Sequence, residues 1–323
     1  MAAITTAETS KQEAILIVRN VHKIFNAHKK SEVRAVDDVS FTIYKGETFG
    51  LVGESGSGKS TTGRMLIKLE DITSGSVFYK GKDITQIKKK SDMMDFRRSM
   101  QMIFQDPFAS LNPRIPVKQI IGDALKLHGI CTTKEEINKR VMELMDIVGI
   151  NRAYINRYPT EFSGGQCQRI GIARALCVNP EFIIADECPS ALDVSIQAQI
   201  VNLLIKLQRE QGMTYLFIAH DLAMVKYISD RIGVMKDGKI LELASANELY
   251  SHPLHPYTIS LLSASPLTDL MQERKRQRID YDPAAHRYLE GSHPAMHEIT
   301  PGHFVYCLTE EVSRYRQMAA SAS

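Results

Sequence analysis

The hydrophobic positions along much of the chain follow the pattern of strands. Two segments rich in β-branched residues, Ala14 to Val21 and Val39 to Tyr44, open the chain and are broken by polar turns. Three shorter apolar runs, Glu47 to Val52, Glu181 to Ala185 and Met213 to Ala219, each end on glycine or polar residues. Because helical stretches separate these runs, we expect a largely parallel sheet with its functional site at the strand ends.

A second pattern, with apolar residues every three or four positions, predicts helices between residues 116 and 157. It is clearest over Val117 to Leu127 and Lys134 to Val148. Either Thr132 or Thr133 is suited to cap the second of these helices. We therefore expect a helical insertion within the α/β pattern.

Prolines mark the start of a third region. Pro253 and Pro256 lie in the segment that opens at Ser251, and two prolines so close together end any preceding helix. The chain beyond them is polar, and its basic run from Arg274 to Arg278 is typical of a solvated surface.

Composition excludes several classes of protein. The 323 residues are 44% hydrophobic and 24% charged, which excludes a disordered chain, collagen and a disulfide-rich miniprotein. Lys and Arg total 40 against 37 for Asp and Glu, so the net charge of +3 gives no reason to expect a nucleic-acid partner.

Membrane-span, secretion and cysteine patterns narrow the choice further. No run approaches the roughly 18 apolar residues of a membrane span, and the first residues are too polar for a secretion signal. The five cysteines are scattered without a C-x-x-C pair, which indicates reduced thiols in a cytosolic protein.

A glycine-rich segment follows the third strand-like run and carries the first chemistry. Residues 53–60, GESGSGKS, match the phosphate-binding pattern G-x-x-x-x-G-K-[ST]. Glycines let backbone N–H groups curl around an anion, and the helix expected from Thr61 directs its positive end at the same phosphates. Lys59 is expected to reach the β- and γ-phosphates and Ser60 to ligate Mg²⁺. The residues expected to hold nucleotide here are Gly53, Glu54, Ser55, Gly56, Ser57, Gly58, Lys59, Ser60 and Thr61.

Two adjacent carboxylates follow the next apolar strand. Asp186 is suited to bind Mg²⁺ directly or indirectly, and Glu187 to polarise the attacking water as a general base. Together with the phosphate-binding segment, this pair predicts ATP hydrolysis.

The segment FSGGQ at residues 162–166, followed by CQR, resembles the L-S-G-G-Q signature of ATP-binding cassette (ABC) ATPases. The resemblance implies an α/β fold: a P-loop NTPase nucleotide-binding domain of the ABC type, with a mixed sheet, a helical subdomain carrying the signature and a short C-terminal extension. It also implies ATP and Mg²⁺ as cofactors. In the family the signature sits at a helix start and clamps the γ-phosphate bound to the opposite subunit. The residues concerned are Ser163, Gly164, Gly165 and Gln166.

The remaining family positions occur in the expected order. Gln105 resembles the Q-loop glutamine, which touches Mg²⁺ and the attacking water, and Asp193 resembles the D-loop aspartate at the dimer interface. His220 matches the switch histidine, which senses the γ-phosphate. The resemblance thus implies a catalytic set of Glu187, His220 and Gln105, and a metal-binding set of Ser60, Gln105 and Asp186.

The resemblance also implies an aromatic contact for adenine, and the chain departs from the family pattern at one position. The family stacks adenine on an aromatic residue of an early strand; Phe25 is the best match, with Tyr44 as a competitor. Family members usually carry D-E-P, whereas here Cys188 follows Glu187 and the proline is displaced to Pro189. This displacement alters the restraint on the backbone leading to the D-loop, but we expect hydrolysis to survive.

Two motifs narrow the transported solute. QDPFASLNPR at residues 105–114 and HPLHPYT at residues 252–258 resemble the Q-loop and the start of the C-terminal extension of oligopeptide and dipeptide importer ATPases. The same group also moves nickel and other small solutes. Some relatives hold an iron–sulfur cluster in this extension, but Cys307 alone is too few thiolates for one. The histidines nearby, expected to be surface residues rather than metal ligands, are His286, His293, His297 and His303.

The resemblance implies that the chain is an energy-coupling ATPase, a peripheral protein at the cytoplasmic face of the cell membrane. Its implied partners are a second ABC ATPase, with a heterodimer slightly favoured over a homodimer, two transmembrane permeases and, indirectly, an extracytoplasmic solute-binding protein. We expect a flexible segment at 1–13, an ATPase domain at 14–250 with the helical subdomain at about 107–170, and an extension at 251–323. The alternatives are a soluble ABC ATPase acting on nucleic acid or the ribosome, and an ATP-binding module without turnover.

Overall fold

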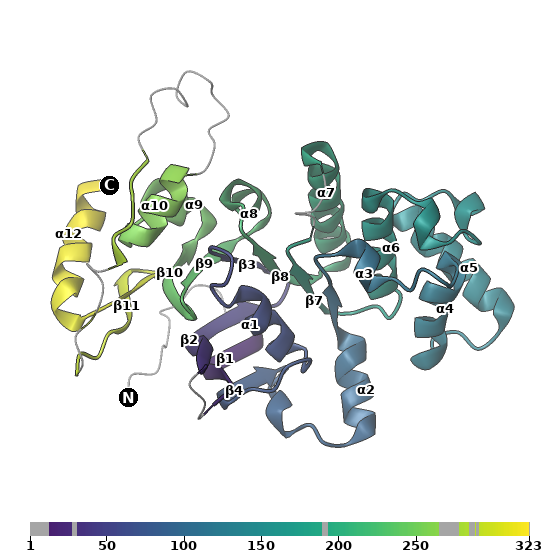
Figure 1. Ribbon diagram of the computed structural model, residues 1–323, viewed down its shortest axis with the longest axis horizontal. Helices are drawn as coiled ribbons and strands as arrows, with labels where there is room; N and C mark the ends of the chain where they lie inside the picture. Colours follow the sequence, from purple (N-terminus) through teal and green to yellow (C-terminus); the bar gives the residue numbers. More distant parts are fainter. Residues whose placement is uncertain are drawn as a thin grey trace.

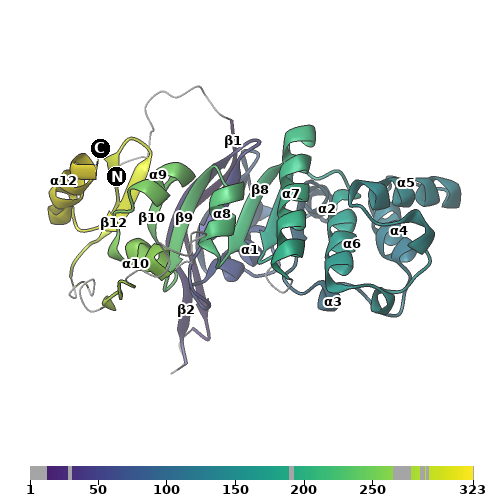
Figure 2. The same ribbon diagram turned by 90° about the horizontal axis from the view of Figure 1, so that it is seen from above.

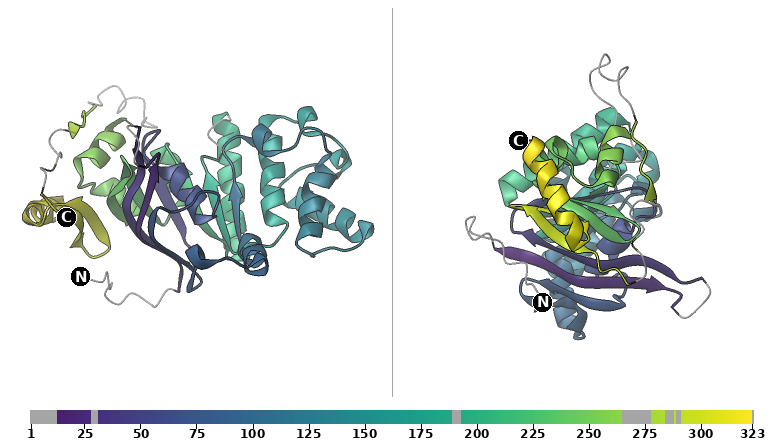
Figure 3. Two further views of the ribbon diagram at one scale, coloured as in Figure 1. Left: turned by 60° about the horizontal axis from the view of Figure 1, so that its bottom comes forward. Right: turned by 90° about the vertical axis from the view of Figure 1, so that its left-hand side faces the viewer.

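A computed structural model describes residues 13–27, 31–188, 193–264, 278–283, 288 and 291–322. The molecule is elongated: strands fill its centre, the helices α3 to α6 form one end, and β11, β12 and α12 form the other (Figures 1 and 3). No helix among these residues is both long enough and apolar enough to cross a membrane.

Eight strands of the described residues form one mixed sheet in the order β11-β12-β10-β9-β3-β8-β7-β6. In this order, neighbouring strands β9, β3, β8, β7 and β6 pair in parallel, as the apolar runs predict. Strand β10 pairs antiparallel with β9 and β12, and β12 pairs antiparallel with β11. Their bounds are β3 Thr48–Val52, β6 Met100–Ile103, β7 Phe182–Asp186, β8 Thr214–Ala219, β9 Arg231–Lys236, β10 Lys239–Ser245, β11 Ala295–Thr300 and β12 His303–Cys307.

A smaller antiparallel sheet has the order β2-β1-β4-β5. Its strands are β1 Ala14–Phe25, β2 Val33–Tyr44, β4 Ser74–Tyr79 and β5 Lys82–Asp83. The predicted end of the first strand at Val21 and the predicted start of the second at Val39 are therefore wrong. Polar residues hide the extra length: Lys23 is buried, and its amine donates a hydrogen bond to the Asp71 carbonyl, 2.8 Å away.

The parallel centre of the large sheet is buried on both faces, as β3, β7 and β8 show. Helices α7 (Val194–Gln211) and α8 (Leu222–Ile228) cover one face, and α1 (Lys59–Leu66) and the small sheet lie on the other (Figure 2). Two hydrophobic cores lie on either side of the sheet. Along β8, Tyr215 and Phe217 pack into one of them, whereas Leu216 and Ile218 pack into the other. Burial on both faces explains why these strands are continuous apolar runs rather than alternating ones.

The helical end confirms the predicted helices. It contains α3 (Pro107–Ser110), α4 (Val117–Leu127), α5 (Lys134–Ile147) and α6 (Gly164–Leu176). Thr133, not Thr132, is the N-cap of α5, and it forms a capping box with Glu136. The other helices of the described residues are α2 Lys90–Ser99, α9 Ala246–Ser251, α10 Pro256–Ala264 and α12 Val312–Ala322, and short 3₁₀ turns occur at Ile84–Gln86, Arg152–Tyr154, Pro159–Glu161 and Thr309–Glu311.

The capping box gives a first prediction. Thr133→Ala removes the acceptor for the Glu136 N–H and is expected to lower the free energy of unfolding by about 1 kcal/mol. Thr132→Ala loses only a hydroxyl bond to the exposed Glu136 carboxylate and should cost a few tenths of that. Urea unfolding followed by circular dichroism measures both variants. Equal losses in the two would contradict the assignment of the cap.

The C-terminal region extends the large sheet. Strand β12 pairs with β10, with Val305 opposite Glu242, and β11 adds the outer edge. The predicted domain boundary at residue 250 stays a prediction. His303 is 1% exposed and bonded to Glu242, so its expected place on the surface is wrong; His286 and most of the basic run lie outside the described residues. The five cysteines, all described, are buried free thiols.

Candidate functional site

The expected site residues gather where the parallel strands end. Strand β3 leads into residues 53–58, β7 into Glu187, and β8 into His220, while Gln105 lies two residues beyond β6. Because β3, β8, β7 and β6 are successive neighbours running in one direction, their carboxyl ends lie side by side. Both sheet neighbours of β8 thus bring a predicted motif to the same edge.

Glycines give the 53–58 loop its shape. Gly56 and Gly58 have φ angles of +83° and +103°, in the left-handed region that favours glycine. A Cβ on Gly58 would overlap the carbonyl oxygen of Ala35 on β2. Gly58 is also the N-cap of α1, so the loop turns directly into a helix start, where an anion is stabilised.

Lys59 closes this loop from inside. Its amine donates to the carbonyl oxygens of Gly53 and Glu54, each at 2.8 Å, and lies 3.3 Å from the Ser57 hydroxyl. Burial lowers the pKa of Lys59, and the nearby carboxylates of Glu187, Asp186 and Glu54 oppose that shift. A largely buried cation inside a ring of backbone is suited to bind an anionic group.

Ser60 and Asp186 form a second part of the site. The Ser60 hydroxyl donates to Asp186 Oδ1 at 2.7 Å, and burial raises the pKa of Asp186 against this bond and the charge of Arg64. No cluster of three or more His, Cys, Asp or Glu suited to a metal exists among the described residues. Mg²⁺ commonly takes one or two carboxylates with phosphate oxygens and water, so a hydroxyl and one buried carboxylate fit it.

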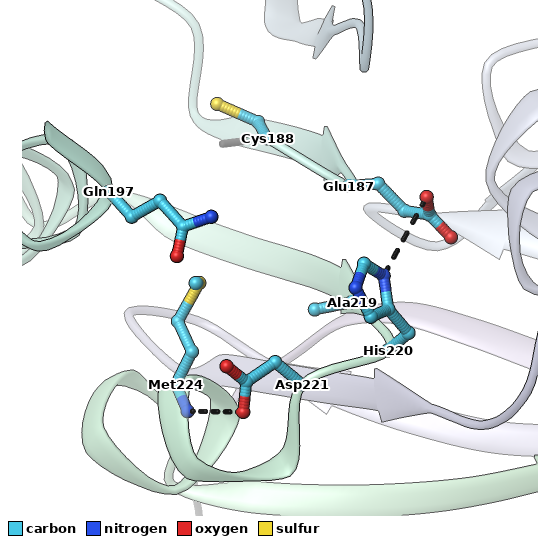
Figure 4. Close-up of a pocket in the computed structure, with 7 residues that line it drawn as sticks. All are labelled: Glu187, Cys188, Gln197, Ala219, His220, Asp221 and Met224. Atoms are coloured by element: carbon cyan, nitrogen blue, oxygen red, sulfur yellow. Dashed lines mark hydrogen bonds and ion pairs between the residues drawn. The ribbon is translucent and has the colours of Figure 1, made fainter. Parts of the chain in front are cut away.

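Glu187 lies between the other two predicted catalytic residues. Its carboxylate Oε2 accepts a 2.6 Å hydrogen bond from Gln105 Nε2 and is 3.9 Å from His220 Nδ1. Figure 4 shows the Glu187 and His220 side chains pointing toward each other beside a pocket that Gln197 and Met224 also line. Glu187 has a φ of +45°, a strained conformation for a non-glycine residue that is typical of functional positions.

The signature residues belong to the helical end. Ser163 caps α6, its hydroxyl accepting from the Gln166 N–H at 3.3 Å, while the Gln166 side chain accepts from the Ser163 N–H at 3.0 Å. A Cβ on Gly165 would overlap Ile196 of α7, so this helix start packs closely. The signature lies on α6, apart from the cluster around Lys59 on α1 (Figure 1). Completion of each site by a second subunit stays a prediction.

The remaining predicted residues are placed as follows. Phe25 ends β1 opposite Val33, whereas Tyr44 lies at the other end of the same ladder, opposite Ala14. Ala35, which approaches Gly58, is near the Phe25 end, so the geometry favours Phe25 over Tyr44; its contact with adenine stays a prediction. Asp193 is the N-cap of α7, and residues 189–192 of the D-loop segment lie outside the described residues.

Cys188, at the usual proline position, is buried. Gln168 of α6 donates its side-chain N–H to the Cys188 sulfur at 2.7 Å. The substituted residue therefore joins the end of β7 to the signature helix. Its left-handed neighbour Glu187 is compatible with Cys188, because a proline there would favour an extended residue before it.

Two contacts of the loop were missed by the sequence reasoning. The Glu54 N–H donates to the Tyr257 hydroxyl at 3.2 Å, and Lys236 forms an ion pair with Glu54, also at 3.2 Å. Tyr257 belongs to the HPLHPYT segment, which the sequence connected only with the transported solute. The phosphate-binding pattern contains no signal for either partner.

Comparisons with known proteins identify the family. A family model described as "ABC transporter" matches residues 36–190. The oligopeptide transport ATP-binding protein OppF of Bacillus subtilis is 57% identical over 94% of this chain and 99% of its own length. The dipeptide transport ATP-binding protein DppF of Lactococcus lactis is 53% identical over 96% of this chain and 99% of its own.

Solved structures show the same fold. A dimeric ATP-binding cassette in a post-hydrolysis state with ADP and phosphate has a TM-score of 0.65 and 29% identity, covering 72% of this chain and 98% of its own. The protein cbiO1 of Clostridium perfringens, part of the ABC transporter complex cbiONQ, has a TM-score of 0.65 and 26% identity, covering 77% of this chain and 96% of its own. The chain belongs to the ABC transporter ATPases, in the group of the oligopeptide and dipeptide transport ATP-binding proteins.

Proposed function

We propose that this chain is the ATP-hydrolysing, energy-coupling subunit of a peptide importer. The observation that carries the proposal is identity of 53–57% along nearly the whole chain with ATP-binding proteins of oligopeptide and dipeptide transport. The strand-end cluster of Lys59, Asp186 and Glu187 supports turnover, because it combines an anion-binding loop with a carboxylate at the same edge.

Different residues of the site are proposed to bind the phosphates, Mg²⁺ and adenine. The 53–61 loop binds the phosphates through backbone N–H groups and the Lys59 ammonium. Ser60 and Asp186, with Gln105, would hold Mg²⁺, which supplies charge neutralisation on the β- and γ-phosphates. Phe25 is proposed to stack on adenine.

Glu187 Oε2 is the proposed acceptor for the proton of the attacking water. Gln105 donates to this oxygen at 2.6 Å, and His220, 3.9 Å away, is proposed to orient the water and contact the γ-phosphate. Gln105 also leads into α3 of the helical end, so movement of that end changes the surroundings of the base. Closure of the two subunits would therefore be coupled to hydrolysis through the position of Glu187.

In the proposed assembly this chain pairs with a second cassette ATPase. A heterodimer with a different ATPase is slightly favoured over a homodimer. Ser163, Gly164, Gly165 and Gln166, with Asp193, would face the nucleotide bound to that partner. The pair would dock on two permeases at the cytoplasmic face of the membrane, supplied by a solute-binding protein outside. No nucleic acid is part of this assembly. The proposed organisation keeps the ATPase domain at 14–250, the helical subdomain at about 107–170, and the extension at 251–323.

Isolation from native membranes tests this assembly. A tagged full chain is expected to co-purify with two integral membrane proteins and a second cassette ATPase. In vesicles containing that complex and its binding protein, ATP-dependent uptake of a short peptide is expected, with none of nickel. Uptake of nickel in place of peptide would contradict the peptide assignment, and co-purification with ribosomes or DNA alone would contradict the transporter role.

A further inference from the structure

The first residues of the C-terminal extension touch the phosphate-binding loop. The Tyr257 hydroxyl accepts a 3.2 Å hydrogen bond from the Glu54 N–H, although the two residues are 203 positions apart. The Tyr257 side chain is 1% exposed, so its hydroxyl is held within the protein and does not exchange freely with solvent partners.

A buried turn fixes the position of Tyr257. The Glu242 carboxylate, 0% exposed, accepts from the N–H groups of Leu254 at 2.8 Å and His255 at 3.0 Å. His303 Nε2 lies 2.7 Å from the same carboxylate. His255 precedes Pro256, the first residue of α10, and its Nδ1 accepts from the Tyr257 N–H at 3.1 Å, as an N-cap does. The position of Tyr257 at the start of α10 is therefore fixed by His255, Pro256 and the buried Glu242.

The bond to Tyr257 restrains one peptide unit of the loop. The Gly53 carbonyl and the Glu54 N–H belong to the same planar trans peptide and point in opposite directions. Lys59 holds the carbonyl end at 2.8 Å, and Tyr257 holds the N–H end at 3.2 Å. Rotation of this peptide would break both bonds, and glycine at position 53 offers little steric resistance to such a rotation.

A second contact holds the Glu54 side chain. Lys236, whose side chain is 15% exposed, lies 3.2 Å from Glu54 Oε2. Its ammonium is 4.6 Å from the ring centre of Tyr257 and 5.5 Å from that of Tyr281. Aromatic faces attract the cation, so the two rings of the extension hold Lys236 against the loop.

We infer that Tyr257 is a positioning residue for ATP binding, because it holds the Gly53–Glu54 peptide in the orientation that directs the Gly53 carbonyl at Lys59. The C-terminal extension is then part of the nucleotide site. Tyr257 contacts the loop that receives the phosphates, so we assign it to nucleotide binding and not to the chemical step. The inference rests on the proposed function, in which residues 53–61 bind those phosphates.

Steady-state ATP hydrolysis by the full chain, assembled with its partners, tests the inference. Tyr257→Phe keeps the ring and removes the hydroxyl; it is expected to raise the KM for ATP about three- to tenfold, since a single hydrogen bond is worth this much, with kcat changed by less than about twofold. Tyr79→Phe is the matched control, because this buried hydroxyl donates to the Ser99 carbonyl in another part of the fold. Its KM and kcat are expected to equal those of the unmodified chain.

Further variants separate the possible failures. Lys59→Ala is expected to abolish binding of a fluorescent ATP analogue; if binding survives, the proposed phosphate loop is wrong. If Lys59→Ala abolishes binding and Tyr257→Phe leaves KM unchanged, or lowers kcat alone, only the role of Tyr257 is overturned. Should Tyr257→Phe not fold, Lys236→Met decides instead: it is expected to raise KM about two- to fourfold, and an unchanged KM overturns the inference.

Discussion

Glu187→Gln is expected to reduce ATP turnover by about 10²–10⁴-fold while leaving nucleotide binding intact, because glutamine keeps the size of the side chain but cannot accept a proton. The Glu187 carboxylate accepts a hydrogen bond from Gln105 and lies 3.9 Å from His220, so the substitution removes the proton acceptor at the centre of these contacts. Phosphate release at saturating ATP measures turnover, and a fluorescent ATP analogue measures binding.

Glu181→Gln is the matched control for this change. Glu181 lies just before the same strand, but it is half exposed and pairs with Lys80 at 2.6 Å, away from the strand end. It should retain the activity of the unmodified chain. If Glu187→Gln hydrolysed ATP at a comparable rate, the general base would have to be another residue, and the displaced proline after Cys188 would become the first structural reason to consider.

The sequence predicted which residues would lie together because the motifs that contain Lys59, Glu187 and His220 each follow a buried parallel strand. Such strands are continuous apolar runs, so the polar residues that end them are conspicuous, as with Asp186 and Glu187 after β7. Interactions between residues close in sequence were equally predictable. The threonines before Glu136 predicted the N-cap of α5, and the structure identifies it as Thr133. These features depend only on residues close together in the chain.

Features that depend on distant residues escaped the sequence reasoning. The ends of β1 and β2 were missed because Lys23 and Asp37, although polar, are held within the pairing by partners from Asp71 and Lys239. His303 was expected on the surface because nothing near it in sequence reveals Glu242, its buried partner 61 positions away. The contact of Tyr257 with the loop is longer-ranged still, and no local period or motif encodes it.

Two glycines with positive φ angles, one in the phosphate-binding loop and one outside it, differ in what surrounds them. Gly58 has a φ of +103°, and a Cβ there would overlap the backbone oxygen of Ala35, which cannot rotate away as a side chain can. Gly81, in the turn between β4 and β5, has a φ of +75° but nothing within 4 Å of an added Cβ. The two positions thus share the backbone strain and differ in the overlap.

Gly58→Ala is therefore expected to lower the free energy of unfolding by about 2–4 kcal/mol and to abolish ATP binding, because strain and overlap add and both displace the start of α1. Gly81→Ala should cost only roughly 1–2 kcal/mol, from strain alone, and leave ATP binding unchanged. Urea unfolding measures the first quantity, and titration with a fluorescent ATP analogue measures the second. Equal losses of stability would show that the overlap with Ala35 is relieved by movement of β2. Retained binding in Gly58→Ala would mean that the phosphates do not depend on the start of α1, which contradicts the anion site proposed at this helix end.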